Sequence, residues 1–146
     1  MMNKGEYIAV HCSATKPNMD IGADTIREWH VKGRGWRDIG YAYVIRRDGT
    51  AEKGRDLNND GETFDDIGAH VRGYNSRAIG ICLVGGLDYR GQPDANFTHA
   101  QYVSLADLIS DLKIKFPSAI VQGHRDFPNV NKACPCFDVV SWWDGV

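Results

Sequence analysis

The sequence predicts an α/β fold, a single domain spanning residues 1–146 in which helices flank a mixed central β-sheet. Three observations predict it. First, 146 residues of which 42% are hydrophobic suit one domain that buries a core without disulfides. Second, the chain contains no repeat, low-complexity tract or linker. Third, short β-prone runs are interspersed with helical patterns, an order that favours a mixed sheet with helices packed against it.

The first half of the chain predicts one strand, one helix and a hairpin of two further strands. Residues 6–12, EYIAVHC, form a β-prone run with His11 near its end. Residues 25–32, TIREWHVK, have helical spacing, and the glycines of GRG at 33–35 are expected to end that helix. Residues 41–55, YAYVIRRDGTAEKGR, alternate in hydrophobicity around Asp48-Gly49, which predicts a hairpin with its turn there.

The second half begins with a buried strand at residues 77–86, RAIGICLVGG, which is apolar on both faces and closed by glycines. The clearest element of the chain is a helix at 98–116. Thr98 and Gln101 fit a capping box, and Phe97 can contact Tyr102 across the first turn. The apolar stripe of this helix consists of Leu105, Leu108, Ile109 and Leu112.

The last elements are a strand in SAIVQGH, residues 118–124, and a short terminal helix. The strand is expected to present His124 in a loop, and Asp138 can cap the helix that carries Trp142 and Trp143.

Charge and hydropathy exclude several partners. The net charge is −2 and the charged residues are scattered, so we expect neither a nucleic acid nor a membrane as partner. The N-terminal stretch lacks the apolar segment of a signal peptide, and no apolar run is long enough to span a bilayer. We therefore expect the protein to be made in a cytoplasm, where thiols stay reduced.

Three side chains with metal-binding chemistry follow β-prone runs or lie near one. His11 and His124 each come at the end of a predicted strand, and Cys134 follows ten residues after His124. Two neutral imidazoles and one thiolate suit zinc, and three protein ligands leave the fourth tetrahedral position open, as a catalytic site requires. A disulfide between Cys134 and Cys136 would be strained.

Ordinary structural roles account for several other residues of the same types. Cys12 and Cys82 lie in apolar runs, where a buried free thiol is the expected state. His30 and His99 lie on predicted helices, and we interpret both as structural or surface residues. On spacing alone, the His, His, Cys set remains open between a metal site and unrelated roles.

Five segments occur in the order seen in one protein family: VHCSATKP, GYAYVIRRDG, AHVRGYNSRAIGICLVGG, DANFTHAQ and KACPCFD. Through these segments the chain resembles the zinc-dependent N-acetylmuramoyl-L-alanine amidases, and among them the small bacteriophage endolysins. The resemblance extends from about Tyr7 to Trp143, and the middle segment is shared with the wider peptidoglycan recognition protein superfamily. It implies the amidase fold, with a mixed sheet and flanking helices.

The resemblance also implies a site. Position by position, it places one zinc ion per chain on His11, His124 and Cys134, and two catalytic residues on Tyr41 and Lys132. The implied reaction is hydrolysis of the amide between N-acetylmuramic acid and L-alanine by zinc-activated water, without a covalent enzyme intermediate. Lys132 would stabilise the oxyanion, and Tyr41 would orient the water or share proton transfer.

Substrate contacts are expected from the segment AHVRGYNS and its neighbours. His70 and Asn75 are the candidates beside the cleft, with His70 touching substrate or the metal-bound water. Arg72 and Arg77 are candidate partners for peptide carboxylates. Cys136 stands where close relatives tend to have serine, and it could be a bystander or a second thiolate near the metal.

The resemblance implies a phage or prophage endolysin, working as a monomer on cell-wall peptidoglycan. It would wait in the host bacterial cytoplasm until another protein permeabilises the membrane. Two alternatives use the same fold: a catalytically weak peptidoglycan-binding protein, and a regulatory protein that inhibits the phage RNA polymerase, as a member of the endolysin group does. A third alternative is a cysteine peptidase using Cys134 with His124, which predicts alkylation sensitivity without dependence on metal.

Overall fold

Among the residues that the structure describes, five strands form one sheet in the order β3-β2-β4-β1-β5. The computed structural model describes residues 5–63 and 66–146; residues 1–4 and 64–65, which the predicted domain includes, lie outside the described part. Of these five strands, β2 and β3 pair in the antiparallel sense, and the other neighbours pair in parallel. The predicted mixed sheet is therefore confirmed. The strands are β1 (Tyr7–Cys12), β2 (Tyr43–Ile45), β3 (Ala51–Lys53), β4 (Ala78–Leu83) and β5 (Ile120–Gly123).

The two faces of the sheet are built from side chains of different size. Because side chains alternate along a strand, each central strand contributes one set to each face. The set facing helix α2 (His99–Lys115) is large and apolar: Ile8, Val10, Ile79, Ile81 and Leu83. The residues between them are Ala9 and His11 in β1, and Ala78, Gly80 and Cys82 in β4. The face away from α2 is thus lined by small residues around one histidine.

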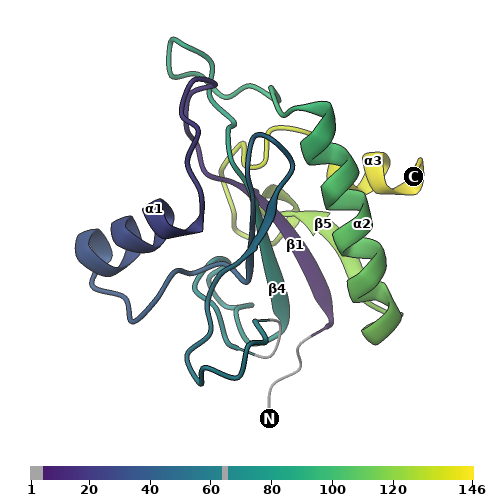
Figure 1. The fold of residues 1–146 in the computed structure, drawn as a ribbon. Coiled ribbons are helices and arrows are strands. Elements are labelled where there is room, and N and C mark those ends of the chain that lie inside the picture. Colours follow the sequence, from purple (N-terminus) through teal and green to yellow (C-terminus); the bar gives the residue numbers. More distant parts are fainter. Residues whose placement is uncertain (1–4, 64–65) are drawn as a thin grey trace.

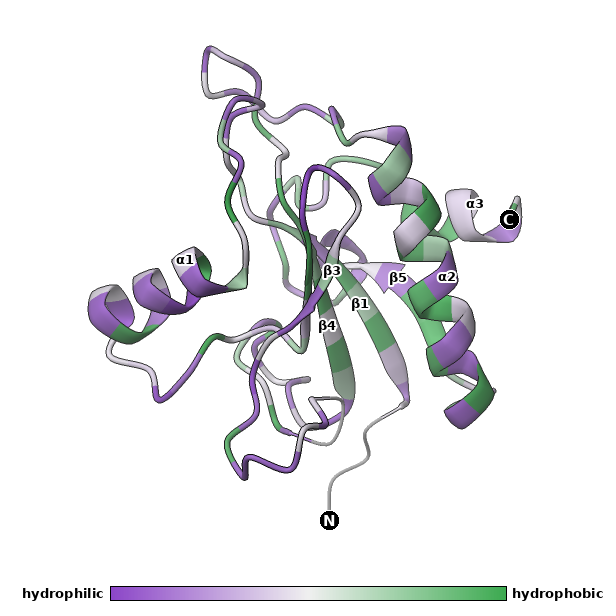
Figure 2. Ribbon diagram, in the orientation of Figure 1, coloured by the Kyte–Doolittle hydropathy of each residue, from purple (hydrophilic) through white to green (hydrophobic). Residues whose placement is uncertain are grey.

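Helix α2 covers the large apolar face, and helix α1 lies on the other side of the sheet (Figure 1). Thr98 caps α2 in the predicted capping box with Gln101, and Phe97 contacts Tyr102 with their ring centroids 6.1 Å apart. The predicted stripe is also confirmed: Leu105, Ile109 and Leu112 are buried, and Leu108 packs against them. Figure 2 shows the hydrophobic residues concentrated on β1 and β4, whereas α1 is mostly hydrophilic.

The predicted start of the first helix needs adjustment. Helix α1 (Ala23–Glu28) begins two residues earlier than expected, because the Glu52 carboxylate of β3 accepts a hydrogen bond from the Ala23 N–H at 2.8 Å. Its cap therefore comes from a distant residue, which local sequence could not indicate. A π-helical segment, Trp29–Gly33, follows and ends at the predicted glycine.

The hairpin is confirmed with Asp48-Gly49 in its turn, but Tyr41 precedes β2 instead of belonging to it. After β5, a 3₁₀ turn (His124–Asp126) and a loop lead to helix α3 (Val139–Asp144), which Asp138 caps by accepting from the Ser141 N–H. Within the described residues, no helix is long and apolar enough to span a membrane.

Candidate metal centre

His11 and His124 are brought together by the parallel pairing of β1 with β5. His11 lies near the carboxyl end of β1 and His124 directly follows β5. Because the two strands are parallel, their carboxyl ends meet at one edge of the sheet. The two imidazole centroids lie 4.6 Å apart. Cys134 reaches the same place from the loop after His124, and two contacts hold it: the Arg125 N–H donates to the Cys134 carbonyl at 3.0 Å, and the Cys12 N–H donates to Cys134 Sγ at 3.2 Å.

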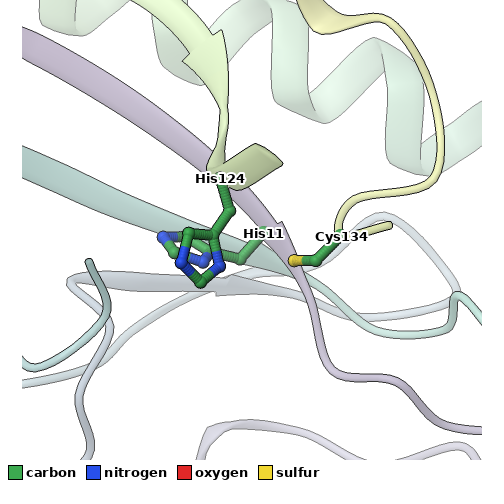
Figure 3. Close-up of side chains that lie close together, drawn as sticks. All are labelled: His11, His124 and Cys134. Atoms are coloured by element: carbon green, nitrogen blue, oxygen red, sulfur yellow. The ribbon is translucent and has the colours of Figure 1, made fainter. Parts of the chain in front are cut away.

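The ligand atoms of these three side chains all lie within 4.8 Å of one another, and the side chains converge in Figure 3. His11 is 1% exposed, and the surrounding residues enclose a pocket of about 360 Å³, called the metal pocket below. It is lined by Cys12, Tyr41, His70, His124, Lys132 and Cys134, among others. The structure therefore assembles the predicted His, His, Cys set at one point.

His70 determines which nitrogen of His11 is free. Its Nδ1 lies 2.9 Å from His11 Nε2, and its own Nε2 lies 3.3 Å from the Ala78 carbonyl oxygen. A carbonyl can only accept, so His70 carries its proton on Nε2 and its Nδ1 accepts a hydrogen bond. His11 must then donate from Nε2, which leaves the lone pair of His11 Nδ1 available to a metal.

Two glycines make room for His70. A Cβ atom at Gly80 would lie 2.8 Å from Cγ and Nδ1 of the His70 ring, and one at Gly68 would lie 2.8 Å from its Cδ2. Each distance is shorter than real Cβ contacts. The small residues on this face of β4 thus allow the imidazole to lie directly against the strand, within reach of His11 on β1.

Burial keeps both histidine ligands neutral. The pKa of His11 is well below its usual range because the ring is buried, and because a proton on it would be repelled electrostatically by His70, His124 and Lys132. Burial, with a further effect of Lys132, lowers the pKa of His124 to about 4. Near pH 7 both imidazoles can therefore offer a lone pair without first losing a proton.

The two predicted catalytic residues line the metal pocket. The Tyr41 ring centroid lies 5.1 Å from that of His11. Burial, reinforced by the neighbouring cysteines, raises the pKa of Tyr41 well above its usual range, so its hydroxyl keeps its proton. Lys132 is exposed on the rim and close enough to lower the pKa of both histidine ligands.

The remaining cysteines are free thiols outside the ligand set. All four cysteines are unpaired by disulfides. Cys136 Sγ donates to the Gly86 carbonyl at 3.4 Å, and burial raises its pKa to about 11. The pKa of Cys12 is also raised, chiefly by a hydrogen bond with Cys134 and then by burial. Cys136 is not part of the cluster formed by His11, His124 and Cys134. This geometry fits the interpretation of Cys136 as a bystander and not as a second thiolate near the metal.

Sequence reasoning missed His30. We interpreted it as structural or surface, but it lines the metal pocket. Its Nδ1 accepts from the Gly40 N–H at 2.9 Å, and its ring lies 4.7 Å from that of Trp36 and 5.6 Å from that of Tyr41. Burial lowers its pKa to about 4, with Arg34 and Arg55 contributing. Helical spacing could not indicate that His30 lines the pocket, because the location of its ring depends on how the segment after α1 folds back.

The predicted substrate contacts divide into two groups. His70, Arg72 and Asn75 line a second pocket that adjoins the metal pocket. Asn75 also braces this segment, since its Oδ1 accepts from the N–H groups of His70 and Val71 at 2.8 and 2.9 Å. Arg77 lines neither pocket: its guanidinium binds the Glu6 carboxylate at 2.6 Å, so its predicted role with peptide carboxylates is not supported.

Known proteins resemble this chain along nearly its whole length. The sequence profile of the N-acetylmuramoyl-L-alanine amidases matches residues 1–137. The endolysin of Klebsiella phage KP32 is 50% identical over 137 residues, covering 94% of this chain and 84% of the relative. The endolysin of Escherichia phage T7 is 47% identical over 139 residues, covering 95% and 85%. The solved structure of the amidase LysC from Clostridium intestinale superposes with a TM-score of 0.70 at 30% identity, covering 90% of this chain and 76% of LysC.

Proposed function

The chain belongs to the N-acetylmuramoyl-L-alanine amidase family and is a peptidoglycan amidase of the phage endolysin type, and we propose that it works with one zinc ion held by His11, His124 and Cys134. The observation that carries this proposal is the convergence of three donor atoms within 4.8 Å at the carboxyl ends of two parallel strands. The bond cleaved joins N-acetylmuramic acid to the L-alanine of the stem peptide.

The residues present fit zinc. The two imidazoles are held neutral, and His11 presents Nδ1 because its Nε2 is bound to His70. The Cys12 N–H donates to Cys134 Sγ at 3.2 Å, which holds the sulfur beside the two imidazoles. Two nitrogens and one thiolate are a donor set that would hold zinc and would leave room for water as a further ligand, as catalytic zinc sites do.

When bound, a zinc ion supplies a Lewis acid that lowers the pKa of water and polarises an amide carbonyl. The remaining steps belong to the chain. Lys132, on the rim of the metal pocket, stabilises the negative charge that develops on the carbonyl oxygen. Tyr41 keeps its proton and donates a hydrogen bond from Oη, orienting the attacking water or the leaving amine.

The experiment that tests the proposal combines metal content with product analysis. Elemental analysis of purified protein should find about one zinc per chain, and incubation with isolated sacculi should release free stem peptides from intact glycan strands. A chelator should stop the release and added zinc should restore it. Release that survives complete metal removal but is blocked by alkylation would refute the zinc mechanism and favour Cys134 as a nucleophile.

The setting of the reaction is also a proposal. A phage endolysin of this kind acts as a monomer from the host bacterial cytoplasm, reaching the peptidoglycan once the membrane has been permeabilised. Sedimentation of the purified protein tests whether it is a monomer. A pulldown against the cognate phage RNA polymerase tests the regulatory partner that the resemblance implies.

A further inference from the structure

The main chain that follows Tyr41 is fastened to the rest of the fold by backbone contacts. The Tyr41 carbonyl accepts a hydrogen bond from the Arg55 N–H at 2.9 Å, and a Cβ atom at Gly54 would collide with the same carbonyl oxygen. The next residue, Ala42, donates from its N–H to the Gly80 carbonyl of β4 at 2.9 Å. The backbone on this side of Tyr41 is therefore fixed against β4 and the segment after β3.

The peptide group that precedes Tyr41 is held by the side chain of His30. The Gly40 N–H donates to His30 Nδ1 at 2.9 Å, and the Gly40 carbonyl accepts from the Ala69 N–H at 3.0 Å. Gly40 is buried, and a Cβ atom there would collide with the Ala69 carbonyl oxygen and lie 3.0 Å from the Trp36 ring. The N–H of this enclosed residue thus depends on an acceptor from the segment after α1.

The imidazole of His30 also packs against the Tyr41 ring, with the two centroids 5.6 Å apart. The Trp36 ring packs against the same imidazole at 4.7 Å, and the Trp36 N–H donates to the His30 carbonyl at 3.1 Å, so His30 is itself held in place. The Tyr41 ring in turn lies 5.1 Å from that of His11. Tyr41 therefore contacts a metal-binding histidine and His30, and a change in His30 would free the tyrosine to move relative to His11.

The two ring nitrogens of His30 have separate roles. A backbone N–H can only donate, so Nδ1 accepts the hydrogen bond from Gly40. Burial lowers the pKa of His30 to about 4, so the ring is neutral near pH 7 and its single proton is on Nε2. Nδ1 acts on the backbone before Tyr41, whereas an N–H at Nε2 can act only on some other group. Substitutions that preserve one position at a time can therefore separate the two.

We propose that His30 is a positioning residue for Tyr41: its Nδ1 holds the peptide group before the tyrosine, and its ring keeps the tyrosine side chain in one orientation in the metal pocket. The inference rests on the proposed function, in which Tyr41 Oη donates a hydrogen bond during the reaction. Positioning matters because a displacement of about 1 Å at a reacting group can lower a rate by as much as about 100-fold. His30 thus has the same relation to Tyr41 as His70 has to His11.

Two substitutions of His30 test this with a soluble muropeptide as substrate. Asparagine carries an acceptor oxygen on Cγ, where His30 has Nδ1, whereas the polar atoms of glutamine lie one bond further out, near the position of Nε2. In zinc-loaded protein, His30→Gln should lower kcat roughly 10- to 100-fold with little change in KM or zinc affinity, and His30→Asn should retain most of kcat. His99→Gln, the same change at an exposed histidine outside both pockets, is the matched control. Equal losses in the two His30 variants, or an active His30→Gln beside an inactive His30→Asn, would overturn the inference.

A double-mutant cycle shows whether the effect of His30 passes through the Tyr41 hydroxyl. Once Tyr41→Phe has removed that hydroxyl, the group that His30 positions is absent, so His30→Gln should lower kcat little further. A merely structural role for His30 would instead lower kcat by the same factor in both backgrounds. Losses that multiply would therefore overturn the inference.

Fluorine NMR of zinc-free protein labelled with 3-fluorotyrosine supplies a readout that needs neither zinc nor turnover. The chain has six tyrosines, and the Tyr41 signal is the one that Tyr41→Phe removes. His30→Gln should broaden this signal, because a ring that is no longer held exchanges between orientations, whereas His30→Asn and His99→Gln should leave it narrow. A narrow Tyr41 signal in folded His30→Gln protein would refute the positioning role even if the amidase is active. Failure of the wild type to hydrolyse the muropeptide would instead refute the proposed function, while the NMR would still decide the role of His30.

Discussion

Replacing Gly80 by alanine should weaken the metal centre although Gly80 is not a ligand. The new methyl group would lie 2.8 Å from the His70 ring, where ordinary contact begins at 3.4 Å. The ring has to move by at least the difference, about 0.6 Å, because the methyl group is fixed to the buried strand β4. A movement of that size is enough to lengthen the 2.9 Å contact with His11 to about 3.5 Å, the limit of a hydrogen bond.

The expected loss of zinc affinity follows from the role of the hydrogen bond that orients His11. Removing the partner that orients a histidine ligand typically costs about 10- to 100-fold in metal affinity, or about 1.4 to 2.7 kcal/mol. Competition against a chromophoric chelator measures the zinc affinity directly. Gly33→Ala is the matched control, because a Cβ atom there would have no neighbour within 4 Å.

A double-mutant cycle with His70→Ala separates this mechanism from general damage. His70→Ala removes both the hydrogen bond and the ring that the new methyl group would strike, so Gly80→Ala should have little further effect in that background. Additive losses would mean that the methyl group acts through another route. Wild-type zinc affinity in a folded Gly80→Ala protein would refute the role assigned to His70.

Four further predictions are simpler. Cys134→Ser should abolish stoichiometric zinc and amidase activity, whereas Cys136→Ser should preserve both, as elemental analysis and sacculus digestion will show. Tyr41→Phe should lower kcat while zinc affinity stays unchanged; a parallel loss of zinc would contradict its role as a hydrogen-bond donor. Thr98→Ala should cost about 1 kcal/mol, or about 2–4 °C in Tm, without lowering activity. His124 has a folded pKa of about 4, below the unfolded value near 6.5, so the unfolded chain binds more protons between these pH values. Zinc-free protein should therefore lose thermal stability as pH falls through that window, and a flat Tm there would contradict the burial argument.

Local pattern was sufficient to predict most elements, because each is specified by its own residues. Helix α2 has its cap, its staple and its stripe within 19 consecutive residues, and all three are confirmed. The start of α1 was wrong by two residues for the opposite reason, since Glu52 supplies its cap from β3.

The clustering of His11, His124 and Cys134 was predictable from sequence, but the contacts that support it were not. His11 and His124 follow β-prone runs, Cys134 completes a set whose chemistry suits zinc, and family resemblance then supported all three. The contact between His11 and His70 joins residues 59 positions apart and depends on the parallel register that places His11 opposite Cys82 and Ala9 opposite Gly80. Hydrophobic periodicity indicates that such strands exist, but it does not state which residues face each other across a pair. The place of His30 in the pocket was missed for a related reason: it depends on a chain reversal after α1.

The alternation along β1 and β4 explains how one sheet supports both a core and a catalytic cleft. Residues that face α2 are large and fully buried, so that face supplies most of the apolar contact that stabilises the fold. Residues on the other face are alanine, glycine and cysteine, so they leave space beside His11 that His70 fills. Thr98→Ala weakens the cap of α2, the helix that covers the first face, whereas Gly80→Ala changes the second face directly. If the two faces have separate roles, the first change should lower Tm without altering zinc affinity, and the second should weaken zinc binding by far more than its effect on Tm would explain.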